Sequence, residues 1–173
     1  APMNTQREYH TATRLMDGKV LVAGGTDGGF PLDTAELYDP ATDTWMTVGQ
    51  MQAPHAQHAA VLLDDGTVLL TGGYNFNGAS PTTEIYDPAT QQFSITVDMN
   101  DFRARHTETL LADGSVLVAG GDNFFGDPPI TESAEIFTII GGIGQPCGQN
   151  AECQSAFCVD GVCCNSACDS PCE

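Results

Sequence analysis

The sequence carries the same hairpin pattern three times, and this repeat limits what the chain can fold into. The copies are YHTATRLMDGKVLVAGG from Tyr9, QHAAVLLDDGTVLLTGG from Gln57 and RHTETLLADGSVLVAGG from Arg105, so equivalent residues lie 48 positions apart. Repeats of roughly 40 to 50 residues are typical of propellers and arrays, in which each repeat is one structural unit. Besides the turn residues, the residues that recur in all three copies include His10, His58, His106, Gly24, Gly25, Gly72, Gly73, Gly120 and Gly121.

Each copy is predicted to form two β-strands joined by a tight turn. The Asp-Gly pair between the two apolar runs, Asp17 and Gly18 in the first copy, favours a two-residue type I′ turn. The second run, VLVAGG, does not alternate polar and apolar residues, which indicates a strand covered on both faces. The glycine pair that ends it suggests a close approach of two backbone segments or a positive φ angle.

Two further strands are expected after each of the first two hairpins. They are AELYD and TWMTV around Trp45, then TEIYD and QFSITV around Phe93, and four strands joined by short turns make one antiparallel sheet. In the third copy the spacing predicts an aromatic residue where Gly144 stands. We therefore expect two full four-stranded units, at about residues 1–50 and 51–98, and a partial third unit at 99–140 that has lost its outer strand.

These features resemble the kelch family over roughly residues 1–138. The resemblance rests on the glycine pair after a hydrophobic strand, on Tyr38 and Tyr86 in the next strand, and on Trp45 or Phe93 beyond it. The sequence motifs DGxVLVAGG and ELYDPAT are most similar to those of bacterial kelch proteins and of the propeller of galactose oxidase-like proteins. The resemblance implies an all-β kelch-type β-propeller with four-stranded blades, of which this chain supplies an open arc.

An open arc leaves two apolar blade faces in contact with water, and propellers typically have four to eight blades. We therefore expect the chain to be a fragment of a longer propeller, completed by its remaining blades or by another copy of the chain. The absence of an initiator Met agrees with a mature or excised piece.

The charge of the chain excludes several partners. Its 5 Lys and Arg against 23 Asp and Glu give a formal net charge of −18, which argues against binding of nucleic acid or anionic membranes. No apolar stretch approaches the roughly 18 residues of a membrane span. A solvated acidic surface is the simplest explanation, and no cofactor is expected. Calcium binding by loop carboxylates around Asp27, Asp122 and Asp127 is the sharper alternative.

The last part of the chain, residues 141–173, reads as a linker followed by a disulfide-rich module. Such density of cysteine in a short segment indicates a disulfide framework in an oxidising compartment, so the protein is expected to be secreted or displayed on the cell surface. Zinc is the competing interpretation, but no CxxC occurs. CxSxFCVDGVCC resembles Cys-rich modules that trail secreted bacterial proteins. The number of cysteines is odd, which suggests that one of them pairs with a thiol beyond Glu173 or forms an intermolecular disulfide. The seven cysteines are Cys147, Cys153, Cys158, Cys163, Cys164, Cys168 and Cys172.

Two polar positions in the repeats invite a functional interpretation. Tyr9 and His10 resemble the adjacent Tyr-His among the copper ligands of galactose oxidase-like radical enzymes, but those enzymes also need a Cys cross-linked to Tyr, and the repeats contain no Cys. A buried structural His, satisfied by backbone and bridging its hairpin to a neighbour, is the simpler hypothesis. Arg7 and Arg103, with His55 at the same position in the second copy, are expected to pair with a carboxylate such as Glu36 or Glu84, or alternatively to anchor a ligand.

Three loops differ between the copies in length and chemistry, whereas the tight turns barely vary. Function is usually carried by variable loops on a rigid scaffold, and aromatic rings beside amides suit protein or carbohydrate ligands. The alternative is that these rings pack back on the blades. The candidate ligand-binding residues are Phe30, Tyr74, Asn75, Phe76, Asn77, Asp122, Asn123, Phe124 and Phe125.

The sequence thus predicts an extracellular binding or adhesion scaffold for a protein or carbohydrate, without catalytic residues. A fragment of a copper radical oxidase and a structural spacer of a large surface protein are the alternatives.

Overall fold

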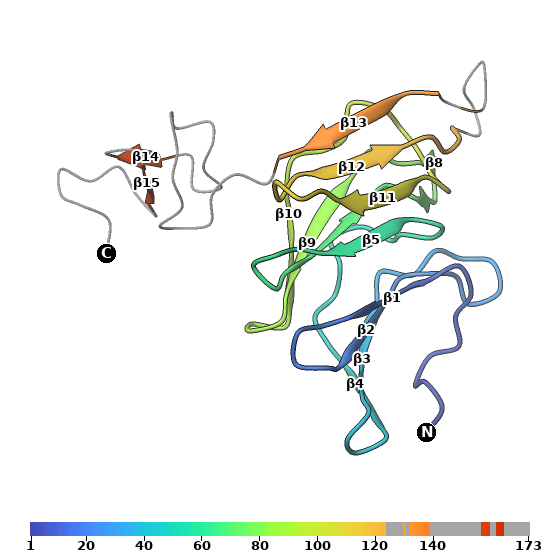
Figure 1. Ribbon diagram of the computed structural model, residues 1–173. Coiled ribbons are helices and arrows are strands. Elements are labelled where there is room, and N and C mark those ends of the chain that lie inside the picture. The colour runs from blue at the N-terminus through green and yellow to red at the C-terminus, as the bar shows by residue number, and fades with distance from the viewer. Residues whose placement is uncertain (124–129, 131, 139–156, 160–161, 165–173) are drawn as a thin grey trace. The chain divides into compact units, whose positions relative to one another are not determined.

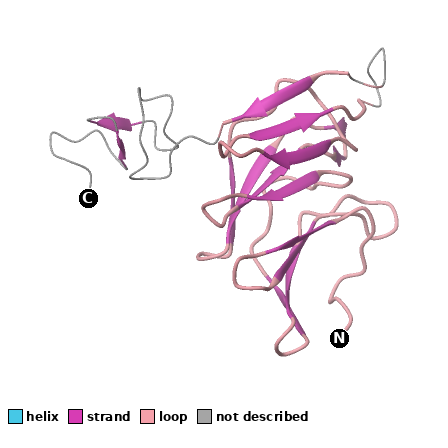
Figure 2. Ribbon diagram, viewed as in Figure 1, coloured by secondary structure: helices cyan, strands magenta, loops and turns pink. Residues whose placement is uncertain are grey.

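The computed structural model of the chain describes residues 1–123, 130, 132–138, 157–159 and 162–164. The chain divides into two compact units, Ala1–Phe137 and Thr138–Glu173. Every regular element among the described residues is a β-strand (Figure 2), which confirms the all-β prediction. No helix capable of crossing a membrane occurs in this described part.

The first blade is a four-stranded antiparallel sheet in simple sequence order. It consists of β1 (Thr11–Arg14), β2 (Val20–Ala23), β3 (Ala35–Asp39) and β4 (Thr44–Thr47). Tyr38 on β3 faces Trp45 on β4, and their rings lie 4.9 Å apart between centroids.

The second blade repeats this sheet, with an insertion. Its strands are β5 (Ala59–Leu62), β6 (Val68–Thr71), β9 (Thr83–Asp87) and β10 (Gln92–Ile95). A small hairpin of β7 (Tyr74–Asn75) and β8 (Gly78–Ala79) forms in the loop between β6 and β9. Tyr86 and Phe93 pair as Tyr38 and Trp45 do.

The third blade shows three strands among its described residues: β11 (Thr107–Leu110), β12 (Val116–Ala119) and β13 (Ala134–Phe137). Gly144, where the fourth strand was expected to be missing, lies outside the described residues. The second unit contains a separate hairpin of β14 (Phe157–Val159) and β15 (Val162–Cys164).

The hairpin turns differ from the predicted two-residue type I′ turn. In the first blade Leu15 pairs with Lys19 across a three-residue loop, because the Leu15 N–H donates to the Lys19 carbonyl (2.8 Å) and the Gly18 N–H to the Leu15 carbonyl (3.0 Å). Only Gly18 has positive φ (89°), which fits a type I turn closed by a glycine bulge. Asp17 is favoured for another reason, since its Oδ1 accepts the Lys19 N–H (3.0 Å).

The blades stack side by side through their innermost strands. β1 lies against β5, and β5 against β11 (Figure 1). The second strand of each hairpin is apolar on both faces because the sheet is sandwiched: Leu21 and Val22, which point to opposite faces of β2, are both buried. The core between the first two blades consists of Leu15, Leu21, Ala23, Ala35, Leu37, Met51, Val68, Leu70, Tyr86 and Phe93.

The glycine pair at the end of the second strand makes room for the next blade. A Cβ on Gly72 would lie 2.4 Å from the carbonyl oxygen of Arg103, and Gly72 also has positive φ (58°). The N–H of Gly73 donates to that same carbonyl (2.9 Å). The first glycine therefore admits the neighbouring backbone and the second binds it.

Candidate functional site

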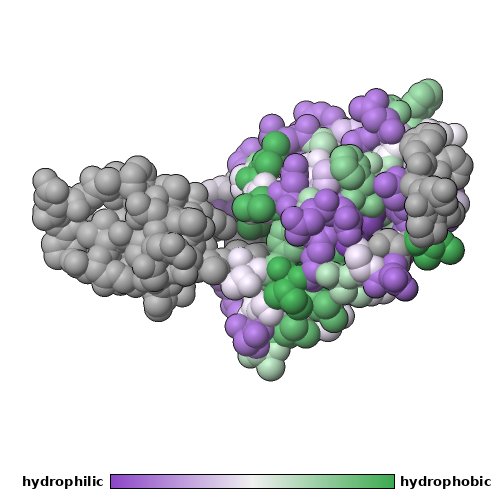
Figure 3. Space-filling view, turned by 90° about the horizontal axis from the view of Figure 1, so that it is seen from above, coloured by the Kyte–Doolittle hydropathy of each residue, from purple (hydrophilic) through white to green (hydrophobic). Residues whose placement is uncertain are grey.

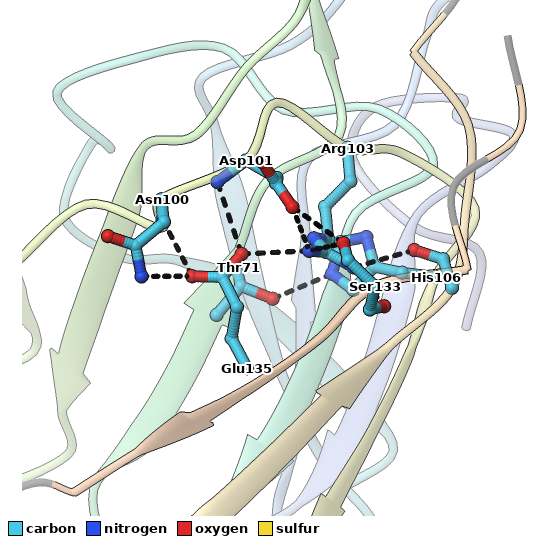
Figure 4. A network of polar contacts seen from close by, with 8 residues as sticks. Thr71, Asn100, Asp101, Arg103, His106, Ser133 and Glu135 are labelled. Carbon is cyan, nitrogen blue, oxygen red and sulfur yellow. Dashed lines mark hydrogen bonds and ion pairs between the residues drawn. The ribbon is translucent and has the colours of Figure 1, made fainter. Parts of the chain in front are cut away.

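A buried ion pair joins the segment that enters the third blade to β13 (Figure 4). The guanidinium of Arg103, which is fully buried, donates from Nη2 to Glu135 Oε1 (2.8 Å) and from Nη1 to the Gly120 carbonyl (2.9 Å). Glu135 also accepts the backbone N–H groups of Asn100 (2.6 Å) and Asp101 (3.1 Å). This network fastens the segment that enters the blade to the third strand and to the end of the second.

The first blade contains the same network. Arg7 donates to Glu36 Oε1 (2.9 Å), and Glu36 accepts the N–H groups of Asn4 (2.7 Å) and Thr5 (2.9 Å). Burial alone would raise the pKa of Glu36, but the hydrogen bonds from Arg7 and the two amides outweigh it, so the pKa lies below its ordinary value. The predicted pairing of Arg7 with Glu36 is confirmed.

In the second blade a histidine takes the place of the arginine. His55 Nδ1 lies 2.6 Å from the Gly72 carbonyl and its Nε2 lies 3.2 Å from Glu84 Oε1. The imidazole thus spans the same two acceptors, a glycine carbonyl and a carboxylate, that the guanidinium spans in the other blades. The three networks make the loop supports rigid in each repeat.

The repeated histidines link neighbouring blades. His58 Nε2 shares a hydrogen bond with Thr11 Oγ1 of the first blade (2.8 Å), and His106 Nε2 shares one with Thr71 Oγ1 of the second (2.7 Å; Figure 4). The predicted bridging role therefore holds for these two, but the partner is a side-chain hydroxyl and not backbone. Burial lowers the pKa of His106 to about 4 and that of His58 well below its ordinary value, so both rings are neutral at physiological pH.

The threonine partners come from different strands of their blades. Thr11 lies on β1 opposite Ala23 on β2, whereas in the second blade Ala59 lies on β5 opposite Thr71 on β6. The threonine hydroxyl thus belongs to the first strand in one blade and to the second strand in the next, and in both cases it hydrogen-bonds the histidine of the following blade. A third pair, Thr107 opposite Ala119, continues the pattern in the third blade.

The variable loops and the connections that enter each blade meet along one edge of the sheets, which we call the loop edge. It comprises residues 6–9, 26–33, 54–57, 74–82, 102–105, 122, 123, 130 and 132. Within each blade a backbone bridge joins the entering connection to the loop: Glu8 to Thr26, Ala56 to Tyr74 and Ala104 to Asp122. Between blades, the Gln57 N–H donates to the Tyr9 carbonyl and the Arg105 N–H to the Gln57 carbonyl, so the edge continues from one blade to the next.

Two candidate loop residues project into solvent. Phe30 is 70% exposed and Phe76 is 68% exposed, so these two rings do not pack back on the blades, whereas Tyr74 is half-buried. Asn75 and Asn77 shape the hairpin that carries Phe76, since the Asn77 N–H donates to Asn75 Oδ1 (2.8 Å). Asn123 is half-buried.

Two other candidates form a cluster with a residue that the sequence did not single out. Arg105 Nε lies 2.9 Å from Asp122 Oδ2, and its guanidinium carbon lies 5.5 Å from the Tyr74 ring centroid. The Tyr74 hydroxyl donates to Asp122 and accepts from Arg105 Nη2 (3.0 Å). Asp122 is thus neutralised by Arg105. Phe124, Phe125 and Asp127 lie outside the described residues.

Sequence reasoning missed further exposed apolar groups on this edge. Tyr9 and Phe102 are both more than half exposed, and so is Ile130. A signal was available, because the residue before the repeated histidine differs in every copy (Tyr9, Gln57, Arg105) and has positive φ in all three. Tyr9 and Arg105 are exposed at this position, whereas Gln57 is half-buried.

No group of three potential metal ligands occurs among the residues whose placement is described. The side chains of the seven cysteines also fall outside this set, so their disulfide pairing stays a prediction.

The kelch motif matches residues 9–52 and 56–100, just over half of the chain. The chain therefore belongs to the kelch-repeat proteins, whose repeats typically serve as non-enzymatic modules for protein–protein interaction.

Three F-box/kelch-repeat proteins of Arabidopsis thaliana are among the similar proteins. The first is 48% identical over 46 residues, the second 40% over 47 and the third 41% over 59, which cover 27%, 25% and 32% of this chain. The chain spans only 12% to 14% of the length of these relatives.

Proposed function

We propose that the chain is a binding scaffold that holds a protein partner on its loop edge. The observation that carries this proposal is the exposure of four aromatic side chains on that one edge: Tyr9, Phe30, Phe76 and Phe102. Large aromatic rings dominate the energy of protein interfaces, because each removes much apolar area from water at little cost in side-chain entropy.

The rigid support of this edge favours the same function. The segments that carry Tyr9 and Phe102 are fastened by the buried pairs Arg7–Glu36 and Arg103–Glu135. A surface whose backbone is already fixed loses less conformational entropy on binding than a flexible one. The aromatic groups are therefore presented in a preorganised arrangement.

Site-specific photocrosslinking tests the proposal. A photoreactive phenylalanine analogue is placed at Phe76 on the loop edge or at Met16, which is exposed on the opposite edge, in the chain expressed in its own organism. We expect a partner protein to be captured at Phe76 and not at Met16, and the purified partner to lose at least tenfold in affinity for the double variant Phe30→Ser, Phe76→Ser. Equal capture at both positions would refute the assignment of the loop edge.

Aromatic rings beside amides also suit a carbohydrate ligand, and a glycan array distinguishes the two classes. Binding of one glycan, lost in the same double variant and without any captured protein, would replace the protein partner by a carbohydrate.

We further propose that the protein acts outside the reducing cytosol, as a secreted or surface protein. This proposal rests on the seven cysteines clustered between Cys147 and Cys172, which suit a disulfide framework. Thiol titration of the unfolded, unreduced protein tests it: at most one free thiol is expected, and seven free thiols would contradict it.

A further inference from the structure

The third blade exposes the face that the first two blades bury. Leu37, Ile85 and Ile136 occupy equivalent positions on β3, β9 and β13, each opposite a leucine of the preceding strand. Leu37 and Ile85 are 5% and 6% exposed because the next blade covers them, whereas Ile136 is 56% exposed. Figure 3 looks down on the molecule from the β13 side, where hydrophobic patches lie between hydrophilic ones. We call this face of the third blade the head face.

The head face also repeats the polar groups that bind a following blade. The Tyr9 carbonyl accepts the Gln57 N–H (2.9 Å), and the Gln57 carbonyl accepts the Arg105 N–H (2.9 Å). The next carbonyl in this series, that of Arg105, receives no hydrogen bond from any described residue. The N–H of Gly121 and the exposed hydroxyl of Thr107 are likewise the successors of groups that the earlier blades use.

The first blade carries the complementary set on its opposite side, which we call the tail face. The Arg7 carbonyl corresponds to the carbonyls of His55 and Arg103 that bind the glycine pairs. The N–H of Tyr9 corresponds to that of Gln57, and His10 corresponds to His58. Within the described part of the chain no residue of another blade binds these groups: the Tyr9 N–H donates to no partner, His10 Nδ1 is buried without one, and the Arg7 carbonyl is approached only by the His10 ring of its own blade.

Val20 supplies the apolar part of the tail face. Its equivalents Val68 and Val116 are fully buried against the preceding blade, whereas Val20 is half-buried. The interface between neighbouring blades occurs twice within the chain. Its two halves are present once more without a neighbour, as the head face of the third blade and the tail face of the first.

We propose that the tail face of a second copy of this chain docks on the head face, so that copies associate head to tail. The expected contacts repeat those between the blades: Gly121 N–H to the Arg7 carbonyl, Tyr9 N–H to the Arg105 carbonyl, and Thr107 to His10. The two faces differ, so the association is heterologous and closes into a ring or grows further. It uses the blade faces and, from the loop edge, only backbone groups of Arg7, Tyr9 and Arg105.

Sedimentation velocity of the full chain with two variants tests the proposal. Ile136→Asp places a charge on the head face and Val20→Asp places one on the tail face. Ile95→Asp, at an exposed apolar position of the outer strand β10, is the matched control. We expect the wild type and the control to associate with increasing concentration, and a non-reducing gel identifies any disulfide-linked species.

The decisive arm mixes the two variants. Each alone is expected to remain monomeric, since one face is blocked in every molecule. An equimolar mixture should form a dimer, because one intact head meets one intact tail. A monomeric wild type at 0.1 mM, association of Ile136→Asp equal to wild type, or failure of the mixture to dimerise would overturn the proposal.

A milder variant guards against misfolding as the cause. Thr107→Ala removes one exposed hydroxyl and should raise the dissociation constant severalfold with an unchanged circular dichroism spectrum. An unchanged constant would contradict the expected contact with His10.

Discussion

Glu108 offers the sharpest test of blade packing. It lies on β11 at the position that Ala12 and Ala60 occupy in the other blades, facing the second blade. Both of its carboxylate oxygens are buried without a hydrogen-bond partner among the described residues. Burial raises the pKa of Glu108 to about 7, although the nearby Thr71 hydroxyl lowers it in part. A carboxyl group that is uncharged at pH 5 and mostly ionised at pH 8 thus lies in the interface between two blades.

The magnitude follows from linkage. A rise of the pKa from 4.5 to about 7 means that the folded state holds the proton more tightly than the unfolded state. The stability is therefore complete below about pH 4.5 and falls as the pH rises toward 7, by about 3 kcal/mol in total. About 2.5 kcal/mol of this loss lies between pH 5 and pH 8.

The assay compares Glu108→Gln with the wild type in urea unfolding at several pH values. Gln cannot ionise, so the variant should gain about 2.5 kcal/mol over the wild type between pH 5 and pH 8. The difference between the two proteins is the informative quantity, because the buried histidines His58 and His106 give an opposite slope that both proteins share. Glu132→Gln, at an exposed position, is the control. A difference that stays flat with pH would refute the buried location of Glu108.

Three further predictions concern the supports of the blades, each measured by chemical unfolding. Gly72→Ala should lower the free energy of unfolding by about 2 to 4 kcal/mol, because the new Cβ would collide with a backbone carbonyl at a position of positive φ. Gly18→Ala, which has open space around it, should lower it by about 1 to 2 kcal/mol. Equal losses would contradict the close approach at Gly72. Arg103→Met should lower the free energy of unfolding by about 3 to 5 kcal/mol, because it leaves Glu135 without its buried partner. Arg14→Met, at an exposed position, should change it little, and a similarly small loss for both variants would count against the ion pair. The hydrogen bonds that Glu135 accepts from Asn100, Asp101 and Arg103 hold its pKa below the ordinary value despite burial, so its contribution is present above about pH 4.5 and lost on acidification; Glu135→Gln should flatten that acid limb.

Much of the fold was predictable because the same strand, turn and pairing residues recur at the same positions in each repeat. The spacing placed the blades, the apolar VLVA runs indicated strands covered on both faces, and the recurring position of Arg7 indicated its pairing with a carboxylate. The turn type was mispredicted because Asp-Gly satisfies two turn geometries. In this chain Asp17 orients the loop by its side chain, and only Gly18 needs positive φ.

Other features leave no clear trace in an alignment of the repeats. The hydroxyl that meets the next histidine comes from Thr11 in one blade and from Thr71 on the other strand in the next, so no column of the alignment conserves it. Glu108 looks like one more variable residue of a strand until packing shows its surroundings. The Arg105 cluster joins two loops through a side chain whose position in the repeat holds Tyr9 and Gln57 elsewhere.

The central claim is that the repeats stack as adjacent blades in sequence order, and amide hydrogen exchange tests it most directly. The N–H groups of Gln57 and Arg105 donate only across blade boundaries, to the carbonyls of Tyr9 and Gln57. Both amides should therefore exchange slowly, at rates near those of the β6 amides, while the exposed turn at Met16 exchanges fast. Exchange of Gln57 and Arg105 as fast as that of the turn would contradict the stacked arrangement.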